Sequence, residues 1–166
     1  MIRLNIIGKR IFVKNFTIKE INDEYISWFS GKNENLKFSR HYKKKYSRTS
    51  LIKNYINLIS SGNIFLGIFD KKLKTLIGTM TIYLNKKKSG NLGILIGNKK
   101  YASKGYALES CLLVIKYLLK KKVVNSIESG AKKENLKMIN LMKNLNMKKV
   151  SKQNSKITTY VISKLK

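Results

Sequence analysis

The sequence ILIGNKKYASKGYALE, residues 94–109, decides the fold of this chain. Its apolar beginning, Ile94–Ile96, predicts a buried strand, and the small and basic residues after it predict a short loop. A long amphipathic helix is expected over residues 106–121, because apolar residues recur there at helical spacing, at Leu108, Leu112, Ile115 and Leu119. The stretch therefore reads as a strand, a loop and the first turn of a helix.

This junction has the properties of an anion-binding site. The first N–H groups of a helix have no partners within the helix, and the helix dipole favours a negative charge beside them. Gly105 would let the backbone approach a bound phosphate closely. A plain connection in which Gly105 only eases the turn explains the loop equally well, so both interpretations stay open at this point.

Length and cysteine content predict one domain, residues 1–166, in a reducing compartment. The only cysteine, Cys111, lies on the apolar side of the predicted helix, and we expect a small buried hydrophobe there. A catalytic thiol is the alternative, although the only histidine, His41, is distant in sequence. No apolar run approaches the roughly 20 residues that a bilayer requires, and the N-terminus lacks the apolar core of a signal peptide, so we expect a soluble, cytoplasmic protein without a membrane partner.

The formal net charge of +28 would normally indicate a nucleic acid, a membrane surface or an acidic ligand as partner. Lysine supplies nearly all of this charge, and lysine, asparagine and isoleucine are frequent along the whole chain. Drift in an A+T-rich coding sequence would produce such a composition at exposed positions, a hypothesis that codon composition tests. Without an arginine-rich face, zinc-finger spacing or an RNA-binding motif, we do not expect nucleic acid as a partner, while the charge would still concentrate a phosphate-bearing substrate.

The pattern along the chain predicts an α/β (α+β) fold. Strands are expected at residues 9–14, 64–70, 75–83, 91–96, 123–129, 147–150 and 157–165, the second to fourth of them as an antiparallel meander. Helices are expected from a Thr17 cap to about Gly31, from Thr49 or Ser50 to Ser60, over residues 106–121 and after Asn135. Together these elements give one core and a mixed central sheet of about seven strands with helices on both faces.

A basic segment between two of the helices, residues 31–48, is expected to be a loop or irregular helix. Phe38, His41 and Tyr42 lie in it among lysines and arginines. Aromatic rings among cations suit a pocket for a flat or phosphorylated ligand, so we expect these three residues to bind the substrate. A solvated loop held down by Leu36 and Phe38 is the alternative.

The order of elements and the stretch 94–109 together resemble the GNAT superfamily of acetyl-coenzyme-A-dependent N-acetyltransferases, over almost the whole chain. In that family, the loop before the central helix carries a motif of the form [QR]-x-x-G-x-[GA] that holds the pyrophosphate of the cofactor. Gly105 and Ala107 match its last two defined residues, whereas Ala102 stands where the family has arginine or glutamine. Lys104 and Lys100 are close enough in sequence to supply the missing charge.

The resemblance implies acetyl-CoA as the co-substrate and no metal. It implies that the pantetheine arm lies along the strand, at Ile94, Leu95 and Ile96. It implies that the pyrophosphate lies at the loop and the first helical turn, at Ser103, Lys104, Gly105, Tyr106 and Ala107. Asn135 matches an asparagine that helps fix the cofactor arm, with a simple helix cap as the alternative, and Asn146 tolerates the left-handed backbone expected of the turn after that helix.

Many relatives move protons with a glutamate on the fourth strand and a tyrosine in the last helix. The corresponding residues here are Asn91 and Met142, and neither can move a proton. Tyr83, at the end of the preceding strand, is the catalytic candidate, followed by His41 and Tyr42, while an ordinary strand aromatic is the alternative for Tyr83. Positioning of the two reactants can supply much of the rate.

Within the superfamily, the sequences YISW at 25–28 and GTMTIY at 78–83 look most like acetyltransferases of nucleotide-linked amino sugars in surface-polysaccharide pathways. The resemblance thus implies acetyl transfer to the primary amine of a small molecule by direct attack, with no covalent acetyl-Cys111. Three alternatives stay open: an N-terminal acetyltransferase of the ribosomal-protein type, a member that binds the cofactor without catalysis, and a basic nucleic-acid-binding module. The acceptor amine and the oligomeric state, a homodimer included, stay open as well.

Overall fold

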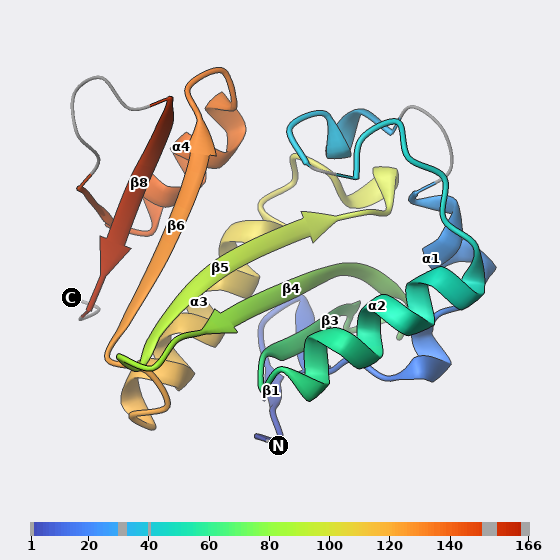
Figure 1. Cartoon of the computed structure of the whole chain (residues 1–166), viewed down its shortest axis with the longest axis horizontal. Coiled ribbons are helices and arrows are strands. Elements are labelled where there is room, and N and C mark those ends of the chain that lie inside the picture. Colours follow the sequence, from blue (N-terminus) through green and yellow to red (C-terminus); the bar gives the residue numbers. More distant parts are fainter. Residues whose placement is uncertain (1, 30–32, 40, 151–155, 164–166) are drawn as a thin grey trace.

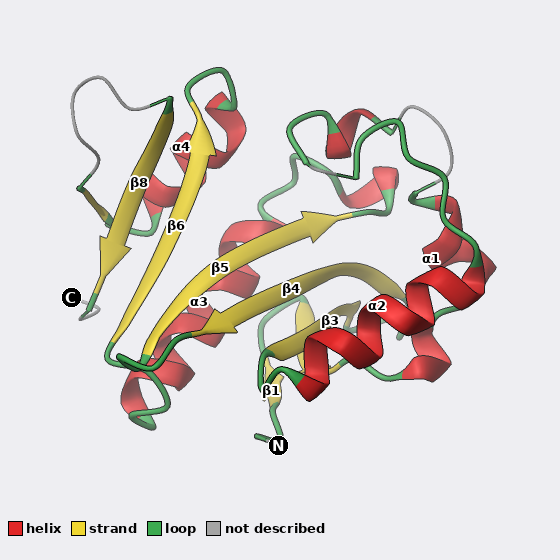
Figure 2. Ribbon diagram, in the orientation of Figure 1, coloured by secondary structure: helices red, strands yellow, loops and turns green. Residues whose placement is uncertain are grey.

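The computed structural model describes residues 2–29, 33–39, 41–150 and 156–163 (Figures 1 and 2). The strands are β1 (Asn5–Ile7), β2 (Ile11–Asn15), β3 (Ile64–Asp70), β4 (Leu76–Leu84), β5 (Ser89–Ile96), β6 (Ser126–Lys132), β7 (Lys148–Lys149) and β8 (Ile157–Ile162). The helices are α1 (Asp23–Ser27), α2 (Arg48–Ser60), α3 (Tyr106–Lys120) and α4 (Leu136–Asn144), with short 3-10 helices η1 (Ile18–Glu20), η2 (Glu34–Leu36) and η3 (Lys99–Tyr101). These strands form one sheet in the order β1-β2-β3-β4-β5-β6-β8-β7.

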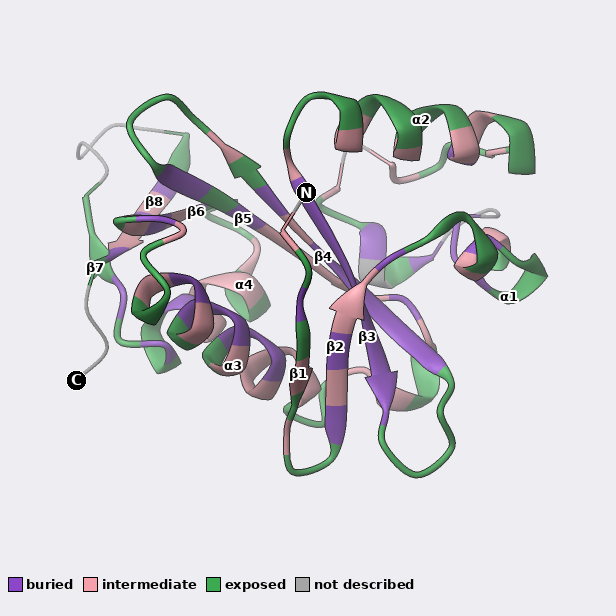
Figure 3. Cartoon of the chain, turned by 90° about the horizontal axis from the view of Figure 1, so that it is seen from below, coloured by how far each residue is buried: buried purple, intermediate pink, exposed green. Residues whose placement is uncertain are grey.

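Helices cover both faces of this sheet, as the sequence predicts (Figure 3). Because strand residues alternate between the faces, Leu66 and Ile68 of β3 pack in one core cluster with α3 and α4, whereas Phe65 packs in a second, aromatic cluster with α1 and α2. Both clusters are closely buried, and Leu66 and Ile68 have no exposed surface. The α/β fold is confirmed, and the sheet has eight strands in the described part of the chain where about seven were expected.

β5 and β6 are the one parallel pair among the described strands, and they separate after a short contact. Their pairing covers only Ser89–Asn91 with Ser126–Glu128. Beyond it, β5 stays paired with β4 and β6 stays paired with β8 (Figure 1). The sheet is thus split into a V between β5 and β6, and Asn91 and Glu128 lie at its vertex.

The prediction of one helix from Thr17 to about Gly31 is wrong, because the chain forms two shorter helices there, η1 and α1. Thr17 and Glu20 do make the predicted capping box, but this box caps the N-terminus of the short 3-10 helix η1 and not a long α-helix. Asn22 then caps α1 by accepting a hydrogen bond from the N–H of Tyr25 at 3.0 Å. The break between the two elements lets Ile21 and Tyr25 enter the same aromatic cluster. Gly31 lies outside the described residues.

Other boundaries shift by a few residues. α2 begins at Arg48, because its cap is Ser47 and not Thr49 or Ser50: the Ser47 hydroxyl accepts from the N–H of Ser50 at 3.2 Å. β1 was not predicted, the strand predicted at 123–129 is β6, three residues later, and the strand at 147–150 is the two-residue β7. The last strand ends at Ile162, and residues 164 and 165 of the predicted span fall outside the described part.

The buried side of α3 also differs from the predicted one. Its fully buried apolar residues are Cys111, Val114, Ile115 and Leu118, whereas Leu112 is 41% exposed. The helix packs on one face of the sheet only, so a side chain one residue beyond Cys111 already turns toward solvent. Cys111 is the small buried residue that was expected. In the described part of the chain, no helix is both long and apolar enough to cross a membrane.

The Trp28 ring leaves no room for a side chain at residue 97. A Cβ atom at Gly97 would overlap the Trp28 ring, whereas a Cβ at Gly93 would meet nothing within 4 Å. We therefore expect Gly97→Ala to lower the free energy of unfolding by about 1–3 kcal/mol, because the buried indole has to shift. Gly93→Ala, in β5 itself, is the matched control and is expected to stay within about 0.5 kcal/mol of wild type. Urea denaturation measures both, and equal midpoints for the two variants would contradict this account.

Candidate functional site

On the edge of β5 that faces the V, the backbone N–H and C=O groups of alternate residues point toward β6. The carbonyl of Leu92 faces β6, because it accepts a hydrogen bond from the Ser129 hydroxyl at 2.9 Å. Backbone groups alternate in direction along a strand, so those of Ile94 and Ile96 face the same side, whereas those of Leu95 face Thr79 in β4. Of the three residues predicted to bind a pantetheine arm, two therefore turn their backbone toward the V, and Leu95 packs its side chain against the aromatic cluster.

The loop that leads into α3 forms a concave arrangement of backbone N–H groups. Ser103 and Gly105 have left-handed φ angles of 59° and 81°, and Gly105 is the N-cap of α3. Within the described residues, no acceptor takes a hydrogen bond from the backbone N–H of Ser103, Lys104, Gly105, Tyr106 or Ala107. Successive amides in alternating right- and left-handed conformations bind anions, so the geometry fits a phosphate.

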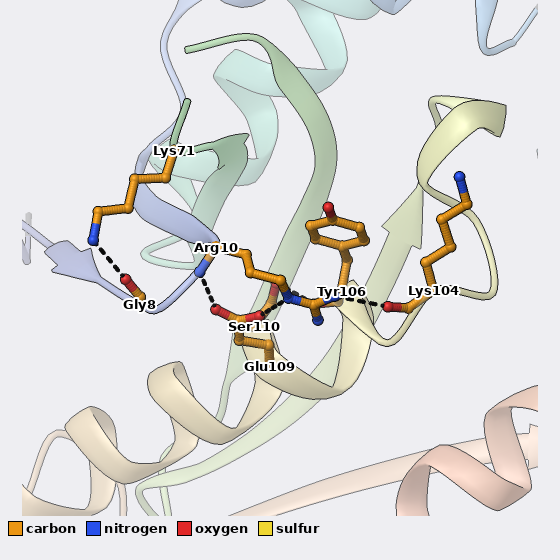
Figure 4. A network of polar contacts seen from close by, with 7 residues as sticks. All are labelled: Gly8, Arg10, Lys71, Lys104, Tyr106, Glu109 and Ser110. Carbon is orange, nitrogen blue, oxygen red and sulfur yellow. Dashed lines mark hydrogen bonds and ion pairs between the residues drawn. The ribbon is translucent and has the colours of Figure 1, made fainter. Parts of the chain in front are cut away.

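Arg10, in the turn between β1 and β2, reaches this loop (Figure 4). Its Nη1 donates to the carbonyl of Lys104 at 3.0 Å, and its Nε donates to Glu109 Oε2 at 2.8 Å. The guanidinium also lies over the Tyr106 ring, 4.3 Å from its centre. Sequence reasoning missed Arg10, since 94 residues separate it from Lys104 and no local pattern marks a contact at that range.

Glu109, in the first turn of α3, is tied to Arg10 twice, because its Oε1 also accepts from the backbone N–H of Arg10 at 2.8 Å. Burial alone would raise the pKa of Glu109, but the hydrogen bonds and charge of Arg10 outweigh burial and lower it. Glu109 is therefore a compensated carboxylate beside the loop.

Three side chains lie in a row across the vertex of the V, on three neighbouring strands: Tyr83, Asn91 and Glu128. Tyr83 is opposite Asn91 in the pairing of β4 with β5, and Asn91 is opposite Glu128 in the pairing of β5 with β6. Residues opposite each other point to the same face of a sheet, here the face away from α3. Tyr83 is 39% exposed, and Glu128 accepts a hydrogen bond from the Ser89 hydroxyl at 3.2 Å.

Glu128 is a candidate site residue that sequence reasoning missed. The strand containing it was predicted three residues too early, and the parallel register that brings Glu128 beside Asn91 has no local sequence signal. Met142, by contrast, is fully buried in the core cluster that includes α3, so this residue is both unable to donate a proton and enclosed away from the surface.

The predicted substrate segment lies near the open end of β5, where η2 contacts that strand. His41 Nδ1 lies 2.7 Å from the Tyr46 hydroxyl, and both rings pack edge-on against Phe29. Tyr42 donates to Glu34 Oε1 at 2.9 Å, a hydrogen bond that raises the pKa of Tyr42. Phe38 is 37% exposed. The structure thus brings His41 and Tyr46 together, while Phe38 and Tyr42 each make separate contacts.

Two hollows in the protein surface lie away from these residues. One of about 510 Å³ is lined by residues of β2, η1 and α2, and one of about 270 Å³ is lined by Ile2 and the start of β3 among others. Neither includes a residue of the α3 loop or of the segment 33–46. The candidate site is therefore defined by backbone direction and side-chain register.

Two further expectations concern single residues. Asn146 has a φ of 55°, so the left-handed turn after α4 is confirmed. The Cys111 thiol is fully buried, and burial raises its pKa to about 12. A thiolate nucleophile at this position is excluded by both properties. Among the described residues, no group of three or more His, Cys, Asp or Glu side chains is arranged to hold a metal ion.

Asn135 is the N-cap of α4, and its side chain accepts from the N–H of Met138 at 3.2 Å. Replacing the cap by alanine leaves that N–H without a partner, so Asn135→Ala should lower the free energy of unfolding by about 1 kcal/mol. Asn135→Ser keeps a capping oxygen and should lower it by less than about 0.5 kcal/mol. Thermal and urea unfolding of the two variants test this; equal losses would mean that the cap is not what Asn135 contributes to stability.

Comparison with known proteins identifies the fold and the family. A family model described as "Acetyltransferase (GNAT) domain" matches residues 10–148. A GNAT-family acetyltransferase from Bacillus anthracis is 17% identical with a TM-score of 0.77, over 96% of this chain and 98% of that one. FdhC, a nucleotide-linked sugar GNAT, is 18% identical with a TM-score of 0.76, over 98% of this chain and 91% of that one.

Further solved structures have the same fold with other named substrates. The spermidine N-acetyltransferase from Vibrio cholerae, solved with CoA and spermine, is 16% identical with a TM-score of 0.75, over 92% of this chain and 95% of that one. A ribosomal-protein-S5-alanine acetyltransferase from Vibrio fischeri is 13% identical, with a TM-score of 0.72 over 96% of each chain. None of the curated proteins compared with the chain matches its sequence. At these identities the likeness establishes the fold, and the family model, which spans most of the sequence, establishes that the chain belongs to the GNAT family of acetyltransferases.

Proposed function

We propose that this protein transfers the acetyl group of acetyl-CoA to the primary amine of a nucleotide-linked amino sugar of surface-polysaccharide biosynthesis. The observation that carries the proposal is the combination of the V between β5 and β6 with the unpaired amides of the α3 loop at its open end. One strand, β5, connects the two, so a single extended ligand can contact both. Family membership supports acyl transfer as the reaction.

The residues present fit acetyl-CoA as co-substrate. Ser103 to Ala107 offer backbone donors to a diphosphate, and the positive φ of Gly105 keeps the loop in the concave form. The backbone groups of Ile94 and Ile96 face the V, where the amide-containing arm of such a ligand would lie. Asn135 caps α4, and we propose that it also contacts the cofactor arm. The thioester supplies an activated acetyl group.

Charge favours an anionic acceptor over a cationic one. The described residues 33–39 and 41–48, which contact β5 through η2, contain five lysines and arginines and one acidic residue, Glu34. A polyamine or a basic peptide would be repelled by this surface, whereas the diphosphate of a nucleotide-linked sugar would be attracted to it. Phe38, His41 and Tyr42 are the proposed contacts to the sugar nucleotide. We place the reaction in the cytoplasm, because a single cysteine without a disulfide partner suits a reducing compartment.

The row at the vertex suggests how protons move. Glu128 takes a proton from the acceptor ammonium, directly or through one water. The neutral nitrogen then attacks the thioester carbonyl carbon, a C–N bond forms and the C–S bond breaks. Tyr83 donates its proton to the departing sulfur and regains one, through water, from the acylated nitrogen, which has to lose its second proton to become the amide. Glu128 then returns its own proton to solvent. Asn91 lies between Tyr83 and Glu128, and its side-chain amide can form hydrogen bonds to the reacting groups.

Direct transfer needs no acyl-enzyme, which agrees with the burial of Cys111. The remaining work is positioning of the amine against the thioester, which is worth up to roughly 7–11 kcal/mol when the geometry is favourable.

The acceptor class is tested by thiol release from acetyl-CoA with a panel of amines. Amino sugars linked to a nucleoside diphosphate should react, with kcat/KM falling as ionic strength rises because the attraction is electrostatic. Free amino sugars, spermidine and basic N-terminal peptides are the comparison arms. Turnover with the peptides alone would establish the ribosomal-protein type of function instead, and CoA binding without any turnover would establish a non-catalytic binder.

Proton transfer is tested by Glu128→Gln, which keeps the shape of the side chain and an acceptor for Ser89. We expect kcat to fall about 100-fold, with the KM for acetyl-CoA within about twofold, because the base is gone. Tyr83→Phe should lower kcat by roughly tenfold or more. Asp23→Asn in α1 removes one charge away from the vertex and serves as the control. Activity of Glu128→Gln within about threefold of wild type would rule out this base.

A further inference from the structure

We propose that Arg10 is the side-chain anchor for the diphosphate of the co-substrate, and that it acts from the β1–β2 turn in place of a residue at position 102. This inference rests on the proposed function. The α3 loop has alanine at position 102, so the loop itself offers no side chain there to bind a phosphate. Arg10 brings a permanent charge to the same place from a distant part of the chain.

The hydrogen-bond inventory of Arg10 leaves donors for a ligand. A guanidinium has five N–H groups. One on Nε binds Glu109 and one on Nη1 binds the carbonyl of Lys104. Within the described residues, no acceptor takes a hydrogen bond from Nη2, which lies 3.4 Å from the position of a Cβ atom at Gly105. The side chain is 42% exposed, so Nη2 stands at the concave amides and is accessible to a phosphate.

The two lysines of the loop are less suited to this role. Figure 4 shows that Lys104 turns its carbonyl toward Arg10 while its side chain extends away. Lys104 and Lys100 are both exposed and carry flexible, strongly hydrated ammonium groups. Arg10, by contrast, is held by the Tyr106 ring, Glu109 and the Lys104 carbonyl, so little entropy is lost when it binds a ligand.

Arg10 also compensates the charge of Glu109. A carboxylate in the first turn of α3 would repel a diphosphate at the neighbouring amides, and the ion pair at 2.8 Å offsets that repulsion. Arg10 thus attracts the phosphate and also compensates Glu109. Removing the charge of Arg10 should therefore weaken CoA binding, whereas removing the charge of Glu109 should leave CoA binding unchanged or strengthen it. This difference separates an anchoring role from a purely structural one.

The test measures CoA binding to the full chain by calorimetry, together with the KM values of acetyl-CoA and of acetyl-pantetheine, which has no diphosphate. We expect Arg10→Ala to weaken CoA binding at least about tenfold and Arg10→Lys to weaken it by an intermediate factor. The KM for acetyl-pantetheine should stay unchanged in both. Glu109→Gln, which leaves Arg10 in place and removes a negative charge, should bind CoA as tightly as wild type or more tightly. Lys71→Ala is the control, because Lys71 binds the carbonyl of Gly8 in the same turn at 3.2 Å.

Two results would overturn the assignment: CoA binding by Arg10→Ala within about twofold of wild type, or equal weakening by Arg10→Ala and Glu109→Gln. Should Arg10→Ala fail to fold in a thermal scan, Arg10→Lys and Glu109→Gln carry the comparison alone. Absence of CoA binding by the wild-type chain would refute the proposed function itself, whereas normal binding by wild type and by Arg10→Ala refutes only the role of Arg10.

Discussion

The parting of β5 from β6 after three paired residues governs the arrangement of everything else in the candidate site. Just beyond the paired residues, the Ser129 hydroxyl of β6 donates a hydrogen bond to the Leu92 carbonyl of β5. From there on, β5 pairs with β4 and β6 pairs with β8. A strand advances about 3.4 Å per residue, so the vertex at Asn91 and the end of β5 at Ile96 are separated by about 17 Å. The proposed reacting groups at one end and the proposed phosphate-binding amides at the other are therefore held apart by a rigid element with paired backbone on one side.

Local sequence patterns were enough for the parts of the fold that local interactions decide. The apolar run Ile64–Asp70 is β3 as predicted, and the helix expected to begin at Tyr106 does so behind a left-handed Gly105. Asn135 and Asn146 take the backbone and capping roles that their short polar side chains favour. Errors arose where two patterns compete: Thr17 and Glu20 have good capping-box spacing, yet tertiary packing of the aromatic residues ends that helical segment after one turn.

The site itself depends on contacts that no local pattern encodes. Arg10 meets Lys104 across 94 residues, and Glu128 meets Asn91 only because β5 and β6 are parallel and in that register. A shift of one residue in the register would turn Glu128 to the opposite face. The same reasoning explains why the basic composition was of limited use: most of the lysines are exposed, whereas the cation that the α3 loop holds in place is an arginine.

The complete burial of Cys111 beneath α3 has a practical consequence for any assay of this chain. With the single thiol of the protein enclosed in the core, its pKa raised to about 12, a disulfide dye added to the folded protein finds no thiolate to titrate. Colour released during turnover then reports the thiol of the product alone. A slow rise of the background on heating would in turn register the opening of the core beneath α3.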